Sequence, residues 1–429
     1  MQPLDYVHAF CLCGVALYLW WREPPRLLLT PLMLLGFLVL YGIGAIVYLA
    51  QAETVPQARE AVTLSLIIMW PCLLIGAEVA RLSMPLIARR AAFNATHWST
   101  LPVINDKTTD QLLVALCVVL ALFMLGMFFA LGKPGQLQTY FALQSTQELK
   151  KFRLELGGQG GYFYQTLVVS IGPFLSFLLF SKARASNDSM LLLIALAMAA
   201  AVLAGKIGSF QKIPWVIYLL QLLMLFQVWK RLDFSFGRAA LLLICLLAGA
   251  LAASFVALPE LDASQLAEFL VYRFFQVNAE VVYQTFYVYP HYLPHTWGMN
   301  IGLIHSIFGS GELSAAHTQV ANFFGAEGAT FDAFYIADAW VDFGYGGVMV
   351  MSLLVGFVVK SVDCFVTSMG KTPLAMALLV SGTYGLFQLM VTSAFTAFLS
   401  GGLVLIPLLV LASNGLVNDV ARARIQWQR

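Results

Sequence analysis

Eleven long runs of apolar residues divide this 429-residue chain, and most of its charged residues stand in the gaps between them. A helix needs about 17 to 25 apolar residues to cross a bilayer core, and in lipid it satisfies its backbone hydrogen bonds internally. The runs lie near residues 6–21, 27–49, 62–80, 111–131, 162–181, 190–204, 213–229, 239–258, 334–359, 373–391 and 396–413. We therefore predict an all-α polytopic membrane protein with about eleven (10–12) transmembrane helices in a single integral membrane domain, residues 1–429.

Composition supports this fold class and excludes a soluble one. Hydrophobic residues make up 60% of the chain and charged residues 11%, and the mean hydropathy is +0.81. A soluble domain of this length is far less apolar. The first run has no basic region in front of it, so we predict a retained helix and not a cleaved signal peptide.

The basic residues set the predicted orientation. With the gaps assigned alternately to two sides, sixteen of the 24 Lys and Arg residues fall on one side and eight on the other. The positive-inside rule then places the N-terminus outside and the C-terminus in the cytoplasm. The eight predicted outer residues run against the insertion bias and are candidates for function: Arg59, Lys133, Lys150, Lys151, Arg153, Lys206, Lys212 and Arg273.

Two predicted outer loops, residues 132–161 and 259–331, are unlike the rest of the chain. Loops of such length without a domain of their own usually carry function. Residues 264–289 of the larger, late outer loop repeat polar side chains at spacings of three and four, which predicts an amphipathic helix that ends before Pro290. None of the six cysteines lies in this loop, so we expect no disulfide framework.

The outer cations form the first candidate site. Ammonium and guanidinium groups make charge-assisted hydrogen bonds to anionic oxygens, so several of them together predict a site for a phosphate or diphosphate. The alternative is that single side chains reach out to lipid headgroups. The candidates for diphosphate binding are Lys151, Arg153, Lys206, Lys212 and Arg273.

Carboxylates and histidines form the second candidate site. Asp338 and Asp342 are four residues apart, so they share a face of the helix predicted after the large loop, where an ionisable residue is by default a functional candidate. Asp332, in the first turn, is better explained as a cap. His317 is the first candidate for a general base, with a surface histidine as the alternative, and Glu280 is a further candidate. No pair of histidines has the spacing of a metal site on a helix, so we expect neither a metal nor a cofactor.

Together these features resemble the bacterial polysaccharide repeat-unit polymerases of the Wzy type, which include the O-antigen and enterobacterial common antigen polymerases. The resemblance covers nearly the whole chain. It is carried by Lys151-Phe-Arg153 followed by Gly157-Gly-Gln-Gly-Gly161, by Gly208-Ser-Phe-Gln-Lys212, by Tyr272-Arg273 with Glu280 downstream, and by Asp338-Ala-Trp-Val-Asp-Phe-Gly-Tyr-Gly-Gly347 leading to Gly356 and Lys360.

The resemblance implies a C-class, metal-independent, inverting glycosyltransferase of the bacterial inner membrane. It implies that donor and acceptor are undecaprenyl-diphosphate-linked oligosaccharides at the periplasmic face, and that membrane lipid, a chain-length regulator and a flippase are partners, with no nucleic acid. Family members typically depend on outer-loop arginines. Arg153 and Arg273 match that pattern, whereas Lys212 stands where relatives often have arginine.

Other functions remain open. An O-antigen ligase is one alternative, although related ligases carry a His-Asn pair where this chain has Phe331-Asp332. A transporter or flippase for lipid-linked glycans is another, although such proteins often contain paired repeats and ionisable groups near the membrane midplane, and this sequence shows no internal repeat. A non-catalytic scaffold is the third. The density of polar residues in the outer loops favours the polymerase.

Overall fold

The described residues of the computed structural model form helices and turns, with no strand among them. The structure describes residues 2–22, 28–51, 54–84, 98, 101–104, 111–143, 148, 151–152, 155–156, 159–210, 212–230, 262, 264–265, 268–269, 272, 276–309, 315–325 and 334–412. Within these ranges, eight helical stretches are long and apolar enough to cross a membrane. The predicted class, a helical polytopic membrane protein, is confirmed.

The long helices follow the predicted apolar runs closely. In two of them a short π-helix interrupts the α-helix, so that α2, η1 and α3 form one stretch and α9, η2 and α10 another. The stretches comprise α1 (Pro3–Trp21), α2 (Leu29–Phe37), η1 (Leu38–Ile43), α3 (Gly44–Gln51), α4 (Pro56–Ser83), α6 (Gln111–Ala130), α9 (Gly161–Thr166), η2 (Leu167–Ile171), α10 (Gly172–Ser186), α11 (Ser189–Ile207), α18 (Tyr335–Ser368) and α19 (Pro373–Val391). A shorter apolar helix, α12, spans Lys212–Trp229.

Two predicted runs do not correspond to one of these helices. The run 239–258 lies outside the described residues. The prediction of one continuous helix over 396–413 is wrong, because the described part forms two short helices, α20 (Ala394–Phe398) and α21 (Leu405–Ala412). Gly402 between them has a φ of +80°, a conformation that favours glycine and interrupts a helix.

Four short helices come from the predicted outer loops: α7 (Lys133–Ala142), α15 (Val277–Val288), α16 (Gly302–Phe308) and α17 (Ala316–Phe323). Helix α15 is part of the predicted amphipathic helix, and it ends at Val288, two residues before Pro290, as predicted. Seven of its twelve residues are buried. It therefore packs within the protein on more than one side, and does not present a broad free face.

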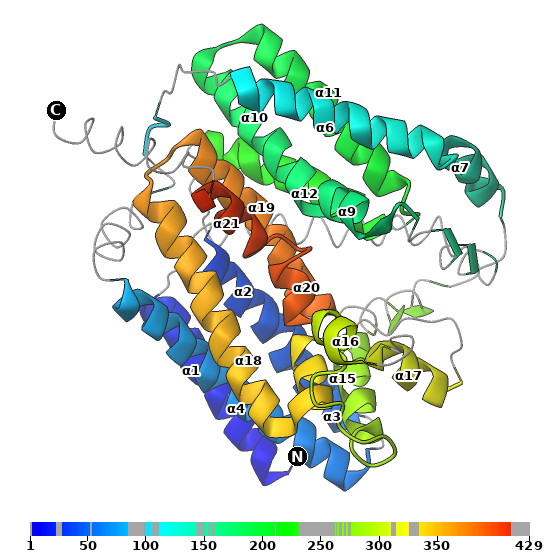
Figure 1. The fold of residues 1–429 in the computed structure, drawn as a ribbon. Helices are drawn as coiled ribbons and strands as arrows, with labels where there is room; N and C mark the ends of the chain where they lie inside the picture. The colour runs from blue at the N-terminus through cyan, green and yellow to red at the C-terminus, as the bar shows by residue number, and fades with distance from the viewer. Residues whose placement is uncertain are drawn as a thin grey trace. The chain divides into compact units, whose positions relative to one another are not determined.

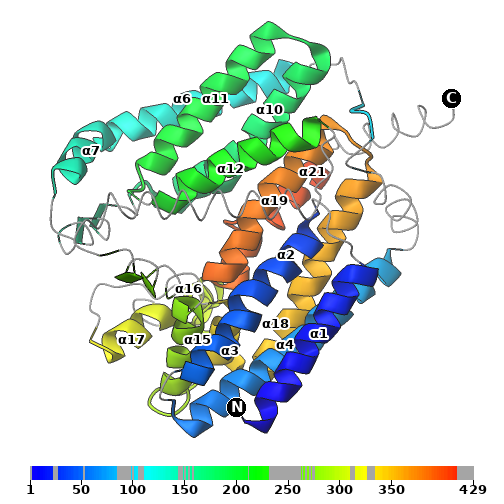
Figure 2. The same ribbon diagram turned by 180° about the vertical axis from the view of Figure 1, so that it is seen from behind.

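By internal packing the chain divides into two compact units. The first unit comprises Met1–Ala80, Asp233–Phe357 and Leu389–Ala394, and the second comprises Arg81–Leu232, Val358–Gln388 and Phe395–Arg429. In the first, α15 packs on α3 and α17, as Figure 1 shows. In the second, α6, α10, α11 and α12 pack together and stay grouped when the molecule is turned (Figure 2).

In the first unit, α4 and α18 cross with their backbones in close contact. A Cβ atom added to Gly76 would lie 2.1 Å from the carbonyl oxygen of Leu353, and one added to Gly356 would lie 2.1 Å from that of Leu73. Small residues allow helices in lipid to approach this closely. The two glycines thus fix the position of α18, which carries the candidate site.

Candidate functional site

The candidate site of the first unit is built around a break in α18. Phe343 (φ −139°, ψ 15°) and Gly344 (φ +58°, ψ −144°) are not helical, so α18 kinks directly after Asp342. The helix predicted over residues 334–359 is therefore present but interrupted. The positive φ of Gly344 is a conformation that side chains disfavour. A Cβ atom on Gly347 would lie 2.2 Å from the carbonyl oxygen of Ala339, so the bend is also too tight for a side chain at that position.

A loop supplies the hydrogen bonds that the break removes. In an unbroken helix the carbonyls of Val341 and Asp342 would accept the N–H groups four residues on. Instead, the backbone N–H of Thr296 donates to the Val341 carbonyl at 3.0 Å, and that of Trp297 donates to the Asp342 carbonyl at 3.1 Å. The loop that follows α15 is thereby attached to the end of the first part of α18.

The Asp342 side chain holds the same loop. One carboxylate oxygen accepts hydrogen bonds from the Thr296 hydroxyl, from the Gly298 N–H at 3.1 Å and from the Asn300 N–H at 3.3 Å. Asp342 is only 4% exposed. Buried carboxylates need such donors, and here three converge on one oxygen. The geometry therefore gives Asp342 the role of ordering the loop.

Asp338 lies one turn earlier and has fewer donors. Its Oδ1 accepts a hydrogen bond from Asn300 Nδ2 at 3.1 Å, and Asn300 Oδ1 accepts the N–H of Ala316 at 2.9 Å. Ala316 is the first residue of α17 and directly precedes His317. The side chain of Asn300 thus connects Asp338 to the first turn of α17, the turn that carries His317.

His317 is well suited to accept a proton. Its side chain is half-buried, and this partial burial lowers the pKa of His317 below the ordinary value of 6.5. The imidazole is therefore neutral at neutral pH, and its ring has no hydrogen-bond partner within the described part of the chain. A neutral imidazole with an unoccupied nitrogen is the form that acts as a general base.

Tyr289 adds a second connection between α17 and α18. Its hydroxyl donates to Gln319 Oε1 at 2.7 Å, and its carbonyl accepts the indole N–H of Trp340 at 2.9 Å. Burial, together with the nearby charges of Asp342 and Asp338, raises the pKa of Tyr289 to about 12. The hydroxyl therefore stays protonated and remains a hydrogen-bond donor.

Sequence reasoning missed Asn300 and Tyr289. An amide and a tyrosine in a loop produce no helical periodicity and no charge pattern, and neither belongs to a spaced motif. Their roles follow from contacts with residues 16 to 51 positions away in the chain. The nearby Pro290 and Gly298 indicated a turn, but not its partners.

Glu280 lies apart from this network. Its carboxylate accepts hydrogen bonds from the Tyr272 hydroxyl at 2.6 Å and from Gln284 Nε2 at 3.1 Å. Helix α15 does contact α18 through Val281 and Ala337. In the described part of the chain, however, no hydrogen bond or ion pair joins Glu280 to Asp338 or His317, so the structure does not bring the third predicted catalytic residue to the other two.

The second unit contains the described cationic candidates. The ring of Phe152, next to the exposed Lys151, packs on Phe210 with centroids 5.2 Å apart. Phe210 lies in the turn between Lys206, near the end of α11, and Lys212, which begins α12. The segment that carries Lys151 therefore lies beside the turn between the other two lysines, as a shared anion site requires.

Lys133 joins this group, although sequence reasoning counted it only among the outer cations. Its Nζ donates to the carbonyl of Leu156 at 2.7 Å and lies 4.7 Å from the centroid of the Phe210 ring. Burial lowers the pKa of Lys133. Arg153 and Arg273, like Asp332, lie outside the described residues.

Lys206 is buried inside the second unit and is 1% exposed. Its Nζ donates to the carbonyl of Val169, in the π-helical segment η2, at 3.3 Å and lies 4.7 Å from the centroid of the Tyr384 ring. No carboxylate in the described part of the chain is within ion-pair distance of it. A buried lysine without a counter-ion in an apolar helix is a functional candidate.

Arg59, another predicted outer cation, is accounted for by an ion pair. Its guanidinium lies 2.7 Å from a carboxylate oxygen of Asp5, and both side chains are largely buried. The charge of Arg59 is therefore neutralised within the first unit. This removes Arg59 from the residues that need a ligand.

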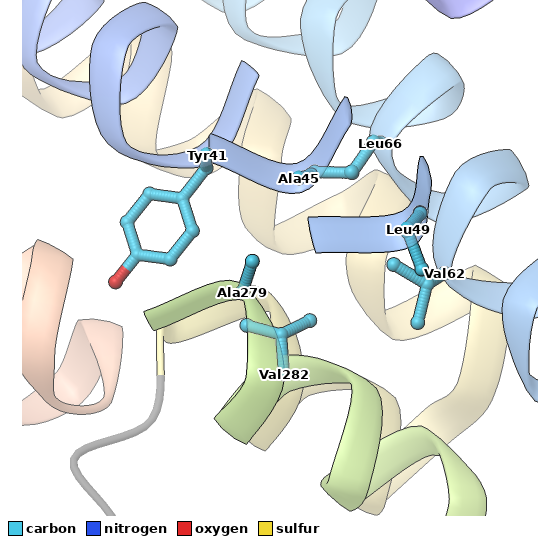
Figure 3. A pocket seen from close by; sticks show the side chains of 7 residues that line it. All are labelled: Tyr41, Ala45, Leu49, Val62, Leu66, Ala279 and Val282. Atoms are coloured by element: carbon cyan, nitrogen blue, oxygen red, sulfur yellow. The ribbon is translucent and has the colours of Figure 1, made fainter. Parts of the chain in front are cut away.

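A small cavity in the first unit is too small for a substrate. Its volume is about 10 Å³, close to the minimum for one water molecule. The hydroxyl of Tyr41, the polar group on its wall, donates to the carbonyl of Met390. The lining residues are Tyr41, Ala45, Leu49, Val62, Leu66, Ala279 and Val282 (Figure 3).

Comparison with known protein families, with curated proteins and with solved structures finds no match to this chain. The chemistry of the two groups of residues is therefore the basis for assigning a function. Asp338 lies in a hydrogen-bond network that reaches the first turn of α17. In the second unit, the ammonium group of Lys133 lies over the Phe210 ring, which also contacts Phe152 beside the exposed Lys151. Within the described residues no three His, Cys, Asp or Glu side chains gather as they would around a metal ion.

Proposed function

We propose that this protein is a polysaccharide polymerase of the bacterial inner membrane that joins undecaprenyl-diphosphate-linked oligosaccharides at the periplasmic face. In this reaction a hydroxyl of the acceptor glycan attacks the anomeric carbon of the donor. A glycosidic bond forms, the bond from that carbon to the diphosphate oxygen breaks with inversion, and undecaprenyl diphosphate leaves. The enzyme must remove the hydroxyl proton and stabilise the charge of the leaving group.

The observation that carries the proposal is the link from Asp338 through Asn300 to the helical turn of His317. A neutral His317 would take the proton of the acceptor hydroxyl, because its lowered pKa keeps it unprotonated at neutral pH. Asp338 would orient the acceptor or share the proton. Asn300 would act as a positioning residue that holds the first turn of α17 to the first part of α18.

The cations would stabilise the leaving diphosphate. Positive groups aimed at developing negative charge supply the electrostatic stabilisation that a metal ion provides in other transferases. The packing of Phe152 on Phe210 supports this role, since it places the segment of Lys151 beside the turn that precedes Lys212. The residues proposed for diphosphate binding are Lys151, Arg153, Lys206, Lys212 and Arg273.

A reconstitution experiment tests the proposal. Purified protein in liposomes receives lipid-diphosphate-linked repeat units, and products are resolved by size. A ladder of longer glycans supports the polymerase. Transfer to lipid A core identifies a ligase, and the lack of any new glycosidic bond contradicts a transferase of either kind.

Variants in the same assay test the individual roles. We expect Asp338→Asn and His317→Gln to lower the rate by about 10²- to 10⁴-fold, the usual range for loss of a general acid or base. Arg153→Ala and Arg273→Ala are expected to abolish long polymers while the protein stays in the membrane. Glu280→Gln serves as the comparison, because its hydrogen bonds lie apart from the network. A larger loss in Glu280→Gln than in Asp338→Asn would contradict the assignment.

A transporter of lipid-linked glycans is the second candidate, because of the break in α18. Transporters often place substrate sites at broken helices, and here the break follows directly after the buried Asp342. Translocation of a fluorescent lipid-linked glycan between the leaflets of a liposome measures this activity. Translocation without ladder formation would favour the transporter over the polymerase.

A further inference from the structure

We propose that four aromatic side chains at the ends of α15 and α17 form a platform that binds the glycan of the lipid-linked substrate. The aromatic platform consists of Tyr287, Tyr292, Phe323 and Phe324. That the glycan is a substrate rests on the proposed function. That the platform binds sugar is argued below from its own geometry.

The four rings of the aromatic platform form one continuous group. The Tyr292 and Phe323 centroids are 4.8 Å apart, those of Tyr287 and Tyr292 are 5.2 Å apart, and those of Phe323 and Phe324 are 5.2 Å apart. Tyr287 also lies 6.3 Å from Phe323 and 6.2 Å from Phe324. These are the separations at which aromatic rings support one another, so the group keeps its shape without a ligand.

Three of the four rings of the aromatic platform are exposed although they are large and apolar, and Tyr287 is half-buried. Tyr292 is 54% exposed, Phe323 43% and Phe324 41%. Such rings stabilise a folded protein most when they are buried. A contiguous exposed aromatic group in a loop region therefore indicates a site for a partner with apolar faces.

The chemistry of the aromatic platform matches a glycan. The hydroxyls of Tyr287 and Tyr292 lie 2.7 Å apart and can exchange hydrogen bonds with sugar hydroxyls at the edge of the rings. Sugar rings present C–H groups on one face and hydroxyls around the rim, so they combine with flat rings that carry hydroxyls. A purely apolar patch would lack the hydroxyl groups that can bond to the rim of a sugar.

The charge of this region argues against an anionic lipid surface as the occupant. The sequence contains no Lys or Arg between Arg273 and Lys360. Segments that bind anionic headgroups are typically rich in basic residues, each of which contributes attraction. The aromatic platform is therefore suited to an uncharged part of the substrate, and the diphosphate must be bound by other residues.

Helix α17 connects the aromatic platform to the candidate catalytic network. Ala316, at its start, donates to Asn300, and Gln319 accepts from Tyr289. Phe323 follows Gln319 by four residues and so lies one turn further on the same side of the helix. The rise from His317 to Phe323 is about 9 Å, the scale of a short oligosaccharide. A glycan on the aromatic platform would thus extend along α17 toward His317.

The test measures glycan binding without the lipid or the reaction. The probe is the oligosaccharide released by mild acid from lipid-linked repeat units of the cells that produce the protein. Saturation-transfer NMR detects its contact with the purified full-length protein in detergent. We expect Phe323→Ala and Tyr292→Ala each to weaken binding by about tenfold, and Tyr292→Phe, which retains the ring, by less. Phe324→Leu provides a second measurement should an alanine variant not fold.

The matched control is Phe308→Ala. Phe308 is 72% exposed on α16, in the same loop but outside the aromatic platform, so its removal should leave binding unchanged. Equal binding by wild-type, platform and control proteins would overturn the proposal. So would a loss of association with phosphatidylcholine vesicles in the platform variants while oligosaccharide binding is unchanged, since the rings would then contact the membrane.

The two proposals can fail separately. Asp338→Asn is expected to retain oligosaccharide binding and to lose ladder formation. If oligosaccharide binding depends on the aromatic platform but the protein forms no ladder, the polymerase is refuted and the glycan site is supported. If the wild-type protein forms a ladder and the platform variants bind and polymerise equally well, the glycan site is refuted and the polymerase is not.

Discussion

Asn300 donates a hydrogen bond from its side-chain amide to Asp338 at 3.1 Å, and the oxygen of the same amide accepts the N–H of Ala316. One side chain thereby uses a donor and an acceptor to hold the first part of α18 to the first turn of α17. The backbone of Asn300 is itself held by Asp342. The position of Asp338 relative to the helical turn of His317 thus depends on Asn300, an uncharged residue.

Asn300→Ala is expected to lower kcat by about ten- to a hundredfold with a smaller change in KM. The substitution removes the partner of the Ala316 N–H and the Asn300 hydrogen bond to the half-buried Asp338 carboxylate, a cost of about 1–3 kcal/mol. Because Asn300 positions the catalytic groups, the effect should fall on the chemical step. Steady-state kinetics in liposomes measure the split between kcat and KM.

Asn322→Ala on α17 is the control for Asn300→Ala. Asn322 is exposed and lies at the far end of the helix from the Asn300 contact. It should behave like the wild type. If both alanine variants lower kcat equally, the link through Asn300 has no special role.

The sequence predicted where the long helices lie, because crossing a bilayer demands a run of apolar residues that can be counted directly. The bounds were less exact, since α4 begins at Pro56 and not near residue 62, and α18 ends at Ser368 and not near residue 359. It did not predict the break after Asp342. That break is stable because Thr296 and Trp297, more than forty residues earlier, supply the missing hydrogen bonds. Apolar periodicity contains no information on such a pairing.

The sequence likewise predicted some features of the candidate sites and not others. The sequence showed that Asp338 and Asp342 share a helix face. It did not show that Asp342 orders a loop while Asp338 connects to α17 through Asn300, because that difference depends on their contacts. Lys206 was recognised as a cation against the insertion bias, but the counting of charges did not reveal its burial against Tyr384. Arg153 and Arg273, the centre of the predicted diphosphate site, remain predictions.

The pH dependence of the initial rate should report His317. Burial lowers the pKa of His317, so the neutral form persists below the ordinary value of 6.5. The rate is expected to be level above about pH 6.5 and to fall as the pH drops through the lowered pKa. Protonation also costs more in the folded than in the unfolded state. Stability contributed by this group is therefore constant above the unfolded pKa and decreases below it.

The control for His317 is the exposed His291 in the same loop. His291→Gln should keep the acidic decline of the rate, whereas His317→Gln should lower the rate and remove the decline from what activity remains. The measurement is the initial rate of the wild type, His291→Gln and His317→Gln at a series of acidic pH values. A decline that persists unchanged in His317→Gln would assign it to another group.

Gly76→Ala should destabilise the protein by about 1–3 kcal/mol. Its new Cβ would lie 2.1 Å from the carbonyl oxygen of Leu353, and since that atom belongs to the backbone of α18, the two helices would have to move apart. Thermal unfolding in detergent measures the change. Gly126→Ala on α6 is the control, because no atom lies within 4 Å of its added Cβ, so alanine should be neutral or stabilising there. Equal losses would show that the α4–α18 crossing is not the cause.

Gly344→Ala tests whether the break in α18 is needed for function. At Gly344 the φ is +58° and the ψ −144°, while the nearest atom to an added Cβ, Nε2 of His295, lies at 3.5 Å, an ordinary contact. The penalty, about 1–3 kcal/mol, therefore arises from the backbone conformation and not from a clash. Relief of this strain would straighten the helix and withdraw Asp342 from the 296–300 loop, so activity should fall further than the loss of stability explains.

Gly346→Ala provides the comparison within the same segment. Gly346 has no positive φ, and no atom lies within 4 Å of its added Cβ, so alanine should preserve both the melting temperature and the rate of ladder formation. Both variants are measured by thermal unfolding and by the reconstituted assay. Full activity in Gly344→Ala would mean that Asp338 and His317 do not depend on the break, whereas equal losses in the two variants would point to a general intolerance of side chains in this turn.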